Sequence, residues 1–183
     1  KRPDSLFVDP LAHKLAGTEG RGAPMGSWIL VPRTRRGDDC LVEHYGRGCR
    51  QLVLLGAGMD SRAFRMGGLD DLKVFEVDQR TIFDVKEPLV ANDRPKVAAR
   101  RVVATDFTAR GAWARDLAAA GFDERTPTVW ILEGLLMYLG ADDTRELLRD
   151  VGRISAPRSA AFHDACSLTY VSKGINVAGA RFI

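Results

Sequence analysis

The sequence predicts an α/β fold built on a mostly parallel, doubly wound sheet. Two short runs, at 52–55 and 129–132, contain only apolar residues and therefore leave no polar face. Such runs are typical of strands that are covered on both sides, as in a parallel sheet. Segments with helical spacing of their apolar residues separate the strand candidates, and a glycine-flanked turn at 56–58 follows the first of them. This alternation indicates helices packed on both faces of one sheet.

Five strands and four helices of the core are predicted from these patterns. The strands are expected at 51–55, 73–78, 101–107, 128–132 and 159–164. The helices are expected at 61–66, 80–87, 111–120 and from about 143 to 154. Pro88 is expected to end the second helix, and Asp143 with Glu146 resembles a capping box at the start of the last one. A short helical piece and a tail are expected over 168–183.

The first 45 residues are predicted to lie outside the sheet. Short apolar patches at 6–15 suggest a helical piece, a glycine-rich stretch at 17–26 suggests a mobile connection, and a helix is expected at 37–45. The predicted division is therefore an N-terminal helical arm and cap at 1–45 and a core at 46–183.

Length and composition indicate one folded core. The chain has 183 residues, of which 45% are hydrophobic, and this suits a single domain. The formal net charge is +3 and the basic residues are scattered, so no nucleic-acid-binding stripe is predicted. No apolar stretch reaches membrane-spanning length, and the first residues do not resemble a signal peptide.

Cysteine and histidine usage gives a prediction of compartment and excludes one class of site. Cys40, Cys49 and Cys166 are odd in number and lack the spacing of disulfide pairs or zinc ligands. They indicate reduced thiols and hence a cytoplasmic location. The histidines do not cluster, so no metal site is predicted.

The glycine turn and the end of the second strand form the first candidate site. Gly56 and Gly58 allow the backbone to approach a ligand closely, although plain tight turns use the same residues. Asp78 ends the second predicted strand about twenty residues later, where nucleotide-binding α/β units place a carboxylate that accepts both ribose hydroxyls. The alternative is that Asp78 caps the following helix.

The next two strand ends also carry acids. Asp106 and Phe107 could offer a polar edge and a flat apolar wall to an adenine, or could be a capping residue beside a core aromatic. Glu133 follows a fully apolar strand, and a buried carboxylate without a partner costs several kcal/mol. Glu133 should therefore lie near a cation, either a partner arginine or a positively charged ligand.

Three arginines precede the predicted N-terminal helix. Arg33, Arg35 and Arg36 could together grip a carboxylate, because guanidinium groups bind carboxylates in bidentate fashion. The alternative is a solvated basic entrance to the helix.

Three blocks of the sequence resemble the leucine carboxyl methyltransferase family. They are LGAGMDSR at 55–62, FEVDQ at 75–79 and EGLLMYL at 133–139. The resemblance covers about residue 3 to the end and implies a Rossmann-like class I methyltransferase fold. It also implies O-methylation of a small-molecule or C-terminal carboxylate, with S-adenosyl-L-methionine as cofactor and S-adenosyl-L-homocysteine as product.

The resemblance implies roles for four residues at the methionine end of this cofactor. Arg33 would hold the methionine carboxylate, and Glu133 would lie near the methionine amine. Gly56 and Gly58 would line the methionine and the ribose.

The remaining implied roles concern the nucleoside and the acceptor. Asp78 would bind the ribose, and Asp106 and Phe107 would lie at the adenine. Arg35 and Tyr138 are the candidates for contact with the acceptor. A carboxylic acid is ionised at neutral pH and needs no general base, whereas an alcohol or phenol would need one, with His163 or Asp164 as candidates.

The chain departs from the family in one respect. Class I methyltransferase sheets close with an antiparallel hairpin of two further strands, and this sequence ends before it, so those strands are expected to be missing and the acceptor stays open. Two other functions remain as alternatives: a cofactor-binding module without turnover, and a nicotinamide-dependent dehydrogenase. The dehydrogenase is disfavoured because Ser61 stands where its fingerprint requires glycine or alanine.

Overall fold

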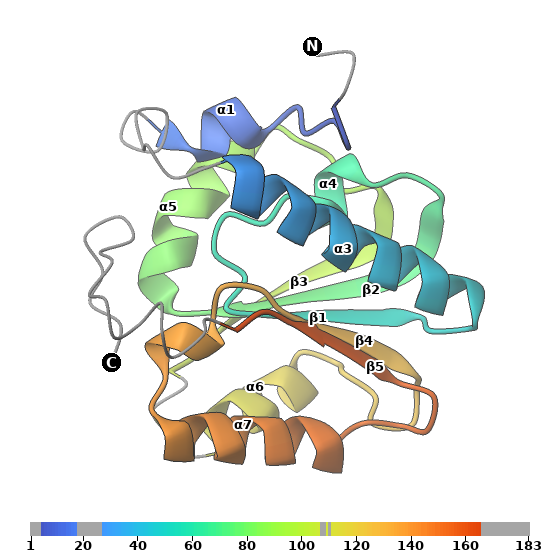
Figure 1. Cartoon of the computed structure of the whole chain (residues 1–183), viewed down its shortest axis with the longest axis vertical. Helices are drawn as coiled ribbons and strands as arrows, with labels where there is room; N and C mark the ends of the chain where they lie inside the picture. Colours follow the sequence, from blue (N-terminus) through green and yellow to red (C-terminus); the bar gives the residue numbers. More distant parts are fainter. Residues whose placement is uncertain (1–4, 18–26, 107–108, 110, 166–183) are drawn as a thin grey trace.

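The computed structural model describes residues 5–17, 27–106, 109 and 111–165, and it shows one five-stranded sheet between two layers of helices (Figure 1). The strands are β1 (Gln51–Leu55), β2 (Leu69–Asp78), β3 (Val97–Ala104), β4 (Thr128–Leu132) and β5 (Ala160–His163). Their order in the sheet is β3-β2-β1-β4-β5, and every neighbouring pair is parallel. The predicted α/β class with a doubly wound sheet is confirmed.

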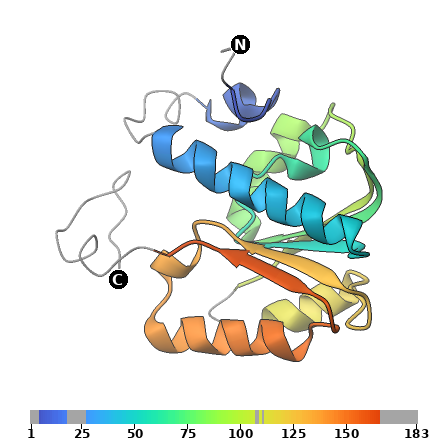
Figure 2. The same ribbon diagram turned by 45° about the vertical axis from the view of Figure 1, so that its right-hand side comes forward.

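The helices divide between the two faces of the sheet (Figures 1 and 2). One layer contains α1 (Ala12–Leu15), α3 (Ser27–Gly46), α4 (Arg62–Arg65) and α5 (Arg80–Val90). The other contains α6 (Ala112–Ala119) and α7 (Ala141–Arg153). A short 3-10 helix, η1 (Leu136–Tyr138), follows β4.

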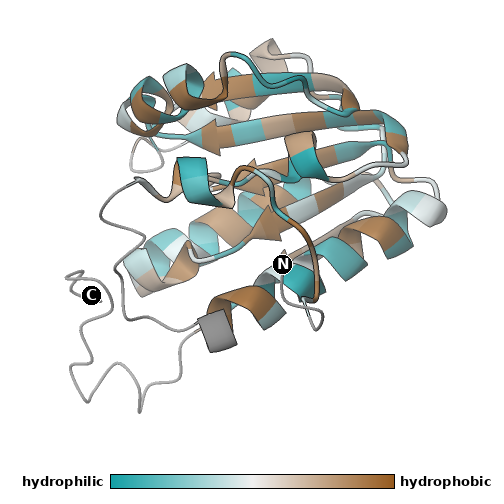
Figure 3. Cartoon of the chain, turned by 90° about the horizontal axis from the view of Figure 1, so that it is seen from above, coloured by the Kyte–Doolittle hydropathy of each residue, from teal (hydrophilic) through white to brown (hydrophobic). Residues whose placement is uncertain are grey.

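Each face of the sheet has its own hydrophobic core, and β1 contributes to both. Leu52 and Leu54 pack into the core under α1, α3 and α4, whereas Val53 and Leu55 pack into the core under α6 and α7. All four side chains are buried, because successive residues of a strand point to opposite faces. Figure 3 shows that hydrophobic residues are frequent along the strands. The apolar run that predicted this strand therefore has a direct structural cause.

The strand order positions the site. β1 lies between β2 and β4, so the chain crosses from one half of the sheet to the other at β1. In open α/β sheets the loops on either side of such a switch point separate and leave a crevice beyond the carboxyl ends of the strands. The glycine turn at 56–58 lies at this point.

Two helices are longer than the sequence indicated, and both contain a proline. α3 begins at Ser27 and includes Pro32, so the arginines at 33, 35 and 36 lie within it and not before it. α5 continues through Pro88 to Val90. A proline removes one intrahelical hydrogen bond, but Leu41 of α3 and Val90 of α5 are buried in the core, and this packing outweighs the loss.

Some predicted boundaries were also wrong. β3 ends at Ala104, so Asp106 lies beyond the strand and Phe107 lies outside the described residues. α7 begins at Ala141 with Gly140 as its N-cap, and Asp143 lies in its first turn, so the expected capping box is absent from this described helix. The predictions for residues 166–183 lie outside the described part of the chain.

The helices in the described ranges include none with both the length and the apolar character needed to cross a bilayer.

Candidate functional site

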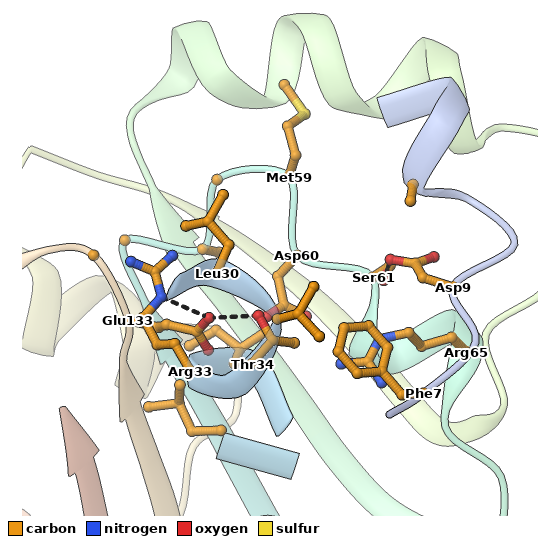
Figure 4. A pocket seen from close by; sticks show the side chains of 18 of the residues that line it. Phe7, Asp9, Leu30, Arg33, Thr34, Met59, Asp60, Ser61, Arg65 and Glu133 are labelled. Carbon is orange, nitrogen blue, oxygen red and sulfur yellow. Dashed lines mark hydrogen bonds and ion pairs between the residues drawn. The ribbon is translucent and has the colours of Figure 1, made fainter. Parts of the chain in front are cut away.

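A cavity of about 760 Å³ opens at the carboxyl ends of β1 and β4 (Figure 4). Its walls come from the glycine turn after β1, the turn after β4, α3 and the N-terminal segment. Five predicted site residues line it: Arg33, Gly56, Gly58, Glu133 and Tyr138. The cavity is therefore where the switch point of the sheet leads one to expect a ligand.

The glycine turn depends on glycine at both positions. Gly56 and Gly58 have φ values of 68° and 46°, in the left-handed region that side chains disfavour. The backbone N–H of Gly56 donates to the Val77 carbonyl at 2.9 Å, which ties the turn to β2. A Cβ at Gly56 would lie 3.0 Å from Leu135 Cδ1, so the turn is also closely packed from the β4 side.

Asp78 connects this turn to the start of α5. Its Oδ2 accepts a hydrogen bond from the Gly58 N–H at 2.7 Å, and its Oδ1 accepts one from the Gln79 N–H at 2.7 Å. The N-cap of α5 is Gln79, so the alternative role of Asp78 as the cap is wrong. Asp78 instead fixes the glycine turn.

Asp106 lies at a second, smaller cavity of about 440 Å³. This cavity is lined by the first residues after β2 and by the last residue of β3 with the two that follow it, namely Gln79, Arg80, Thr81, Ala104, Thr105 and Asp106. Asp78 therefore stands between the two cavities, because it is bonded to one lining residue of each. Along the carboxyl ends of the strands, Asp78 and Asp106 lie on the β2 and β3 side of β1, and Glu133 lies on the β4 side.

Glu133 has two arginine partners. Arg33 Nε donates to its Oε1 at 3.0 Å, and Arg62 Nη2 donates to its Oε2 at 2.6 Å. Thr34 Oγ1 also donates to Oε1, at 2.8 Å. Of the two kinds of cation predicted for Glu133, the described contacts show the partner arginine. Figure 4 shows Glu133 with Arg33 and Thr34 on one side of the cavity.

Arg62 was not predicted as a site residue, yet it organises the wall. Its side chain is 2% exposed and binds Asp38 at 2.8 Å, Asp60 and Glu133. Burial lowers the pKa of Arg62, but the carboxylates of Asp60, Glu133 and Asp38 raise it to a net value above the ordinary one. A Cβ at Gly37 would lie 2.7 Å from Arg62 Nη2, so a glycine in α3 is what admits the guanidinium. Gly37, a glycine within a helix, was the one feature of the sequence that could have indicated a side chain packed closely against α3.

Arg33 has a second carboxylate partner. Its Nη1 lies 3.1 Å from Oδ2 of Asp164, the residue just after β5. Asp164 Oδ1 accepts the Gly134 N–H at 2.6 Å, and Gly134 has a φ of 73°. A Cβ at Gly134 would lie 3.2 Å from Arg33 Nη1, so this turn must also remain small. Asp164 therefore joins β5, the turn after β4 and α3.

The three arginines of α3 do not converge. Arg35 Nε donates to Asp39 at 2.8 Å, and its Nη1 donates to the Leu6 carbonyl at 2.9 Å, beside a separate shallow groove. Arg36 is exposed. Of the two alternatives for these arginines, a joint grip on one carboxylate is wrong, because Arg35 lies two residues after Arg33 and so points in nearly the opposite direction from the helix. Tyr138 lines the main cavity and is 46% exposed.

The N-terminal segment closes the far side of the cavity through residues that were not predicted to belong to the site. Ser61 Oγ donates to Asp9 Oδ2 at 2.6 Å. Arg65 makes two 2.7 Å bonds to Asp38 and lies over the Phe7 ring at 4.7 Å. The labelled side chains in Figure 4 show Phe7 and Asp9 facing the Arg33 and Glu133 cluster across the cavity.

Carboxylates outnumber cations in this wall. Around the cavity and in the contacts of its lining arginines, the described acids are Asp9, Asp38, Asp60, Glu133 and Asp164. They face the guanidinium groups of Arg33, Arg62 and Arg65. The described site is thus net acidic and suits a ligand that carries positive charge.

The sheet order and the crevice define the class: an α/β protein with a ligand cavity at the switch point of a doubly wound sheet. Comparison with known sequences defines the family. Residues 1–152 match the family described as leucine carboxyl methyltransferase, and the chain belongs to that family.

Relatives and solved structures agree with this assignment. A Frankia alni protein named "Putative S-adenosyl-L-methionine-dependent methyltransferase" is 42% identical over 86% of this chain and 60% of its own length. A Streptomyces avermitilis protein with the same description is 40% identical over 96% of this chain and 65% of its own length. The chain therefore spans somewhat less than two thirds of these relatives. A Thermobifida fusca structure titled a "putative methyltransferase" shares the fold, with a TM-score of 0.52 and 18% identity over 93% of this chain and 68% of its own.

Proposed function

We propose that this chain is the cofactor-binding part of an S-adenosyl-L-methionine-dependent O-methyltransferase that converts a carboxylate to a methyl ester. One observation supports this most: a glycine turn and the Arg33–Glu133 pair line one cavity in a member of the leucine carboxyl methyltransferase family. The relatives' names point to the same cofactor.

The residues of the main cavity fit the methionine end of the cofactor. Arg33 offers a guanidinium to a carboxylate, and Glu133 offers a carboxylate to an ammonium. Gly56 and Gly58 present backbone without side chains beside them. In this proposal these four residues bind the amino-acid group and the sulfur side of the ribose.

Asp78, which is bonded to the lining residue Gln79, and the residues of the smaller cavity fit the nucleoside. Asp78 is the carboxylate proposed for the ribose hydroxyls, and it can accept further hydrogen bonds because each carboxylate oxygen has two acceptor sites. Asp106 is proposed to meet the exocyclic amine of adenine from its place beside Gln79 and Thr105. Phe107 keeps its predicted place at the adenine as a proposal.

The acidic excess fits the charge of the donor. S-adenosylmethionine supplies an electrophilic methyl group on a sulfonium, and the acceptor oxygen forms its C–O bond as the C–S bond breaks and the electron pair stays on sulfur. Removing that positive charge weakens the attraction of the net acidic wall, so this wall favours the donor over the product.

The acceptor class follows from what the site must do. A carboxylate is already ionised at neutral pH, so no proton is removed and alignment is the main requirement. A well-held pair of reactants can lower the barrier by about 7 kcal/mol or more. Tyr138, at the rim of the cavity, is the residue we propose to contact the acceptor. We assign Arg35 no role in the transfer, because it is bonded to Asp39 away from the cavity.

A transfer assay tests this function. The protein is incubated with methyl-labelled S-adenosylmethionine and a set of carboxylic acids and peptides with free C-termini. Label that enters the acceptor and is released by mild base supports ester formation. Saturable binding of S-adenosylhomocysteine without transfer would support a binding module, and heat from NAD but not from S-adenosylhomocysteine would support a dehydrogenase.

A further inference from the structure

Arg33 and Glu133 each have a second partner, so the bond between them can open without leaving either charge alone. Glu133 also accepts hydrogen bonds from Arg62 at 2.6 Å and from Thr34 at 2.8 Å. Arg33 also pairs with Asp164 at 3.1 Å. Breaking a buried ion pair is costly mainly when it leaves a charge uncompensated, and these second partners prevent that.

The Arg33–Glu133 pair also matches the charges of an amino-acid group. A free amino-acid end carries one carboxylate and one ammonium, which complement Arg33 and Glu133 respectively. When such a group binds between the two side chains, the bond from Arg33 Nε to Glu133 Oε1 is the contact that is exchanged for bonds to the ligand. In the pair, Arg33 takes the place of the ligand's ammonium beside Glu133, and Glu133 takes the place of the ligand's carboxylate beside Arg33. The pair is in this sense a place-holder for the ligand that the proposed function assigns to this cavity.

From this geometry we propose that Asp164 is a positioning residue for ligand binding. Its carboxylate holds Arg33 by Nη1 while Nε is released from Glu133, so the guanidinium stays at the cavity and turns to the ligand's carboxylate. The same side chain holds the Gly134 N–H, and Gly134 lines the cavity. This inference rests on the proposed function, because it requires a ligand with an amino-acid end.

The competing explanation is that Asp164 only stabilises the turn after β4. The two roles use different atoms of the carboxylate: Oδ1 accepts the Gly134 N–H, and Oδ2 pairs with Arg33. Asp164→Asn can keep the first contact through its amide oxygen while it removes the charge. It therefore separates positioning of Arg33 from support of the turn.

The experiment compares two ligands by titration calorimetry. S-adenosylhomocysteine has the amino-acid end, and 5′-methylthioadenosine has the same nucleoside without it. We expect D164N to weaken binding of S-adenosylhomocysteine by about tenfold, the order of a charge-assisted contact, and to change binding of methylthioadenosine by less than about twofold. D150N, which removes the ion-pair partner of Arg153 on α7 at a side chain about as exposed as Asp164, is the matched control and should change neither affinity.

A second variant tests whether Asp164 acts through Arg33. In an R33Q background, D164N should cause no further loss of S-adenosylhomocysteine affinity, because effects of residues in one network are not additive. An equal loss for both ligands, no loss for either, or the same loss in the R33Q background would overturn the role of Asp164.

If the unmodified protein binds methylthioadenosine and S-adenosylhomocysteine equally, the place-holder idea is wrong while the nucleoside site stands. If it binds neither, the proposed function fails as well.

Discussion

Two glutamates, one in β2 and one just after β4, on opposite sides of the central strand β1, have similar partners but different surroundings. Glu76, within β2, is fully buried and bound by Lys86 at 2.7 Å and by Arg100 at 2.7 and 2.8 Å. Glu133, just after β4, is bound by Arg33 and Arg62 at similar distances. Its side chain is 11% exposed and lines the main cavity, whereas Glu76 lines none of the described cavities.

The difference shows that a buried, arginine-bound carboxylate does not by itself mark a site. Glu76 pairs with positions inside the sheet, so its cations come from α5 and β3 and enclose it. Glu133 lies one residue past the strand, where the chain turns away and leaves space. Position relative to the strand end separates a structural ion pair from one that can meet a ligand.

The largest effect on stability should come from breaking the enclosed cluster, which consists of Glu76, Lys86 and Arg100. Glu76→Ala removes the ion-pair partner of fully buried Lys86, and loss of one member of a buried pair costs about 3–5 kcal/mol. We expect a loss of this size in the free energy of unfolding, measured by urea titration. The affinity of the folded fraction for S-adenosylhomocysteine should not change. The double variant Glu76→Leu with Lys86→Met should recover most of the stability, and a failure to recover it would mean that shape and not charge dominates here.

Glu133→Gln should have a smaller effect on stability and a clear effect on ligand binding. Arg62 keeps Asp38 and Asp60, and Arg33 keeps Asp164, so the loss of stability should be about 1–2 kcal/mol. Affinity for S-adenosylhomocysteine should fall by about tenfold or more, while methylthioadenosine should be little affected. Equal stability losses for Glu133→Gln and Glu76→Ala, without any change in binding, would remove the distinction between the two clusters.

Asp78→Ala tests the other end of the crevice. The variant loses two hydrogen bonds that hold the glycine turn and α5, together with the carboxylate proposed for the ribose. We expect S-adenosylhomocysteine and methylthioadenosine both to bind about tenfold or more weakly, whereas Glu133→Gln should weaken only S-adenosylhomocysteine. Unchanged affinity for methylthioadenosine, measured by calorimetry, would show that the nucleoside lies elsewhere.

The smallest effect concerns Glu87, a partly exposed carboxylate that pairs with Arg100 at the edge of the enclosed cluster. The hydrogen bond from Arg100 lowers the pKa of Glu87 below its ordinary value of 4.5, against the opposing effect of burial. A carboxylate with a lowered pKa stabilises the fold above that ordinary value and loses this contribution as the pH falls through the lower, folded-state pKa. Because Glu87 is 43% exposed, the contribution should be about 0.5 kcal/mol or less. The difference in urea midpoint between wild type and Glu87→Gln should be present at neutral pH and vanish in acid; a difference that persists in acid would contradict this.

Local sequence patterns predicted the parts of this chain that have one dominant local cause. β1 and β4 were predicted with the right ends because each contains four consecutive apolar residues, which need cover on both faces of the sheet, and all five positions of each strand are buried. The length of α3 was not predicted correctly. Pro32 and the basic residues indicated a helix that starts later, but the packing of α3 on the core outweighed them.

The partners of the site were harder to predict than its members. Glu133 was expected to meet a cation, but its pairing with Arg62 joins residues 71 positions apart, and Asp164 reaches Arg33 across 131. Such contacts depend on the sheet order and on the small residues Gly37 and Gly134, which admit the guanidinium groups. Single residue types could indicate the chemistry, but only the assembled sheet shows which charges meet.

Titration of the unmodified protein with S-adenosylhomocysteine, beside an identical titration with NAD, tests the central claim most directly. The cavity described here should bind one molecule of S-adenosylhomocysteine per chain, and R33Q should weaken that binding by about tenfold. NAD should give no saturable heat. No binding of S-adenosylhomocysteine, or binding that is indifferent to Arg33, would contradict the assignment of this cavity.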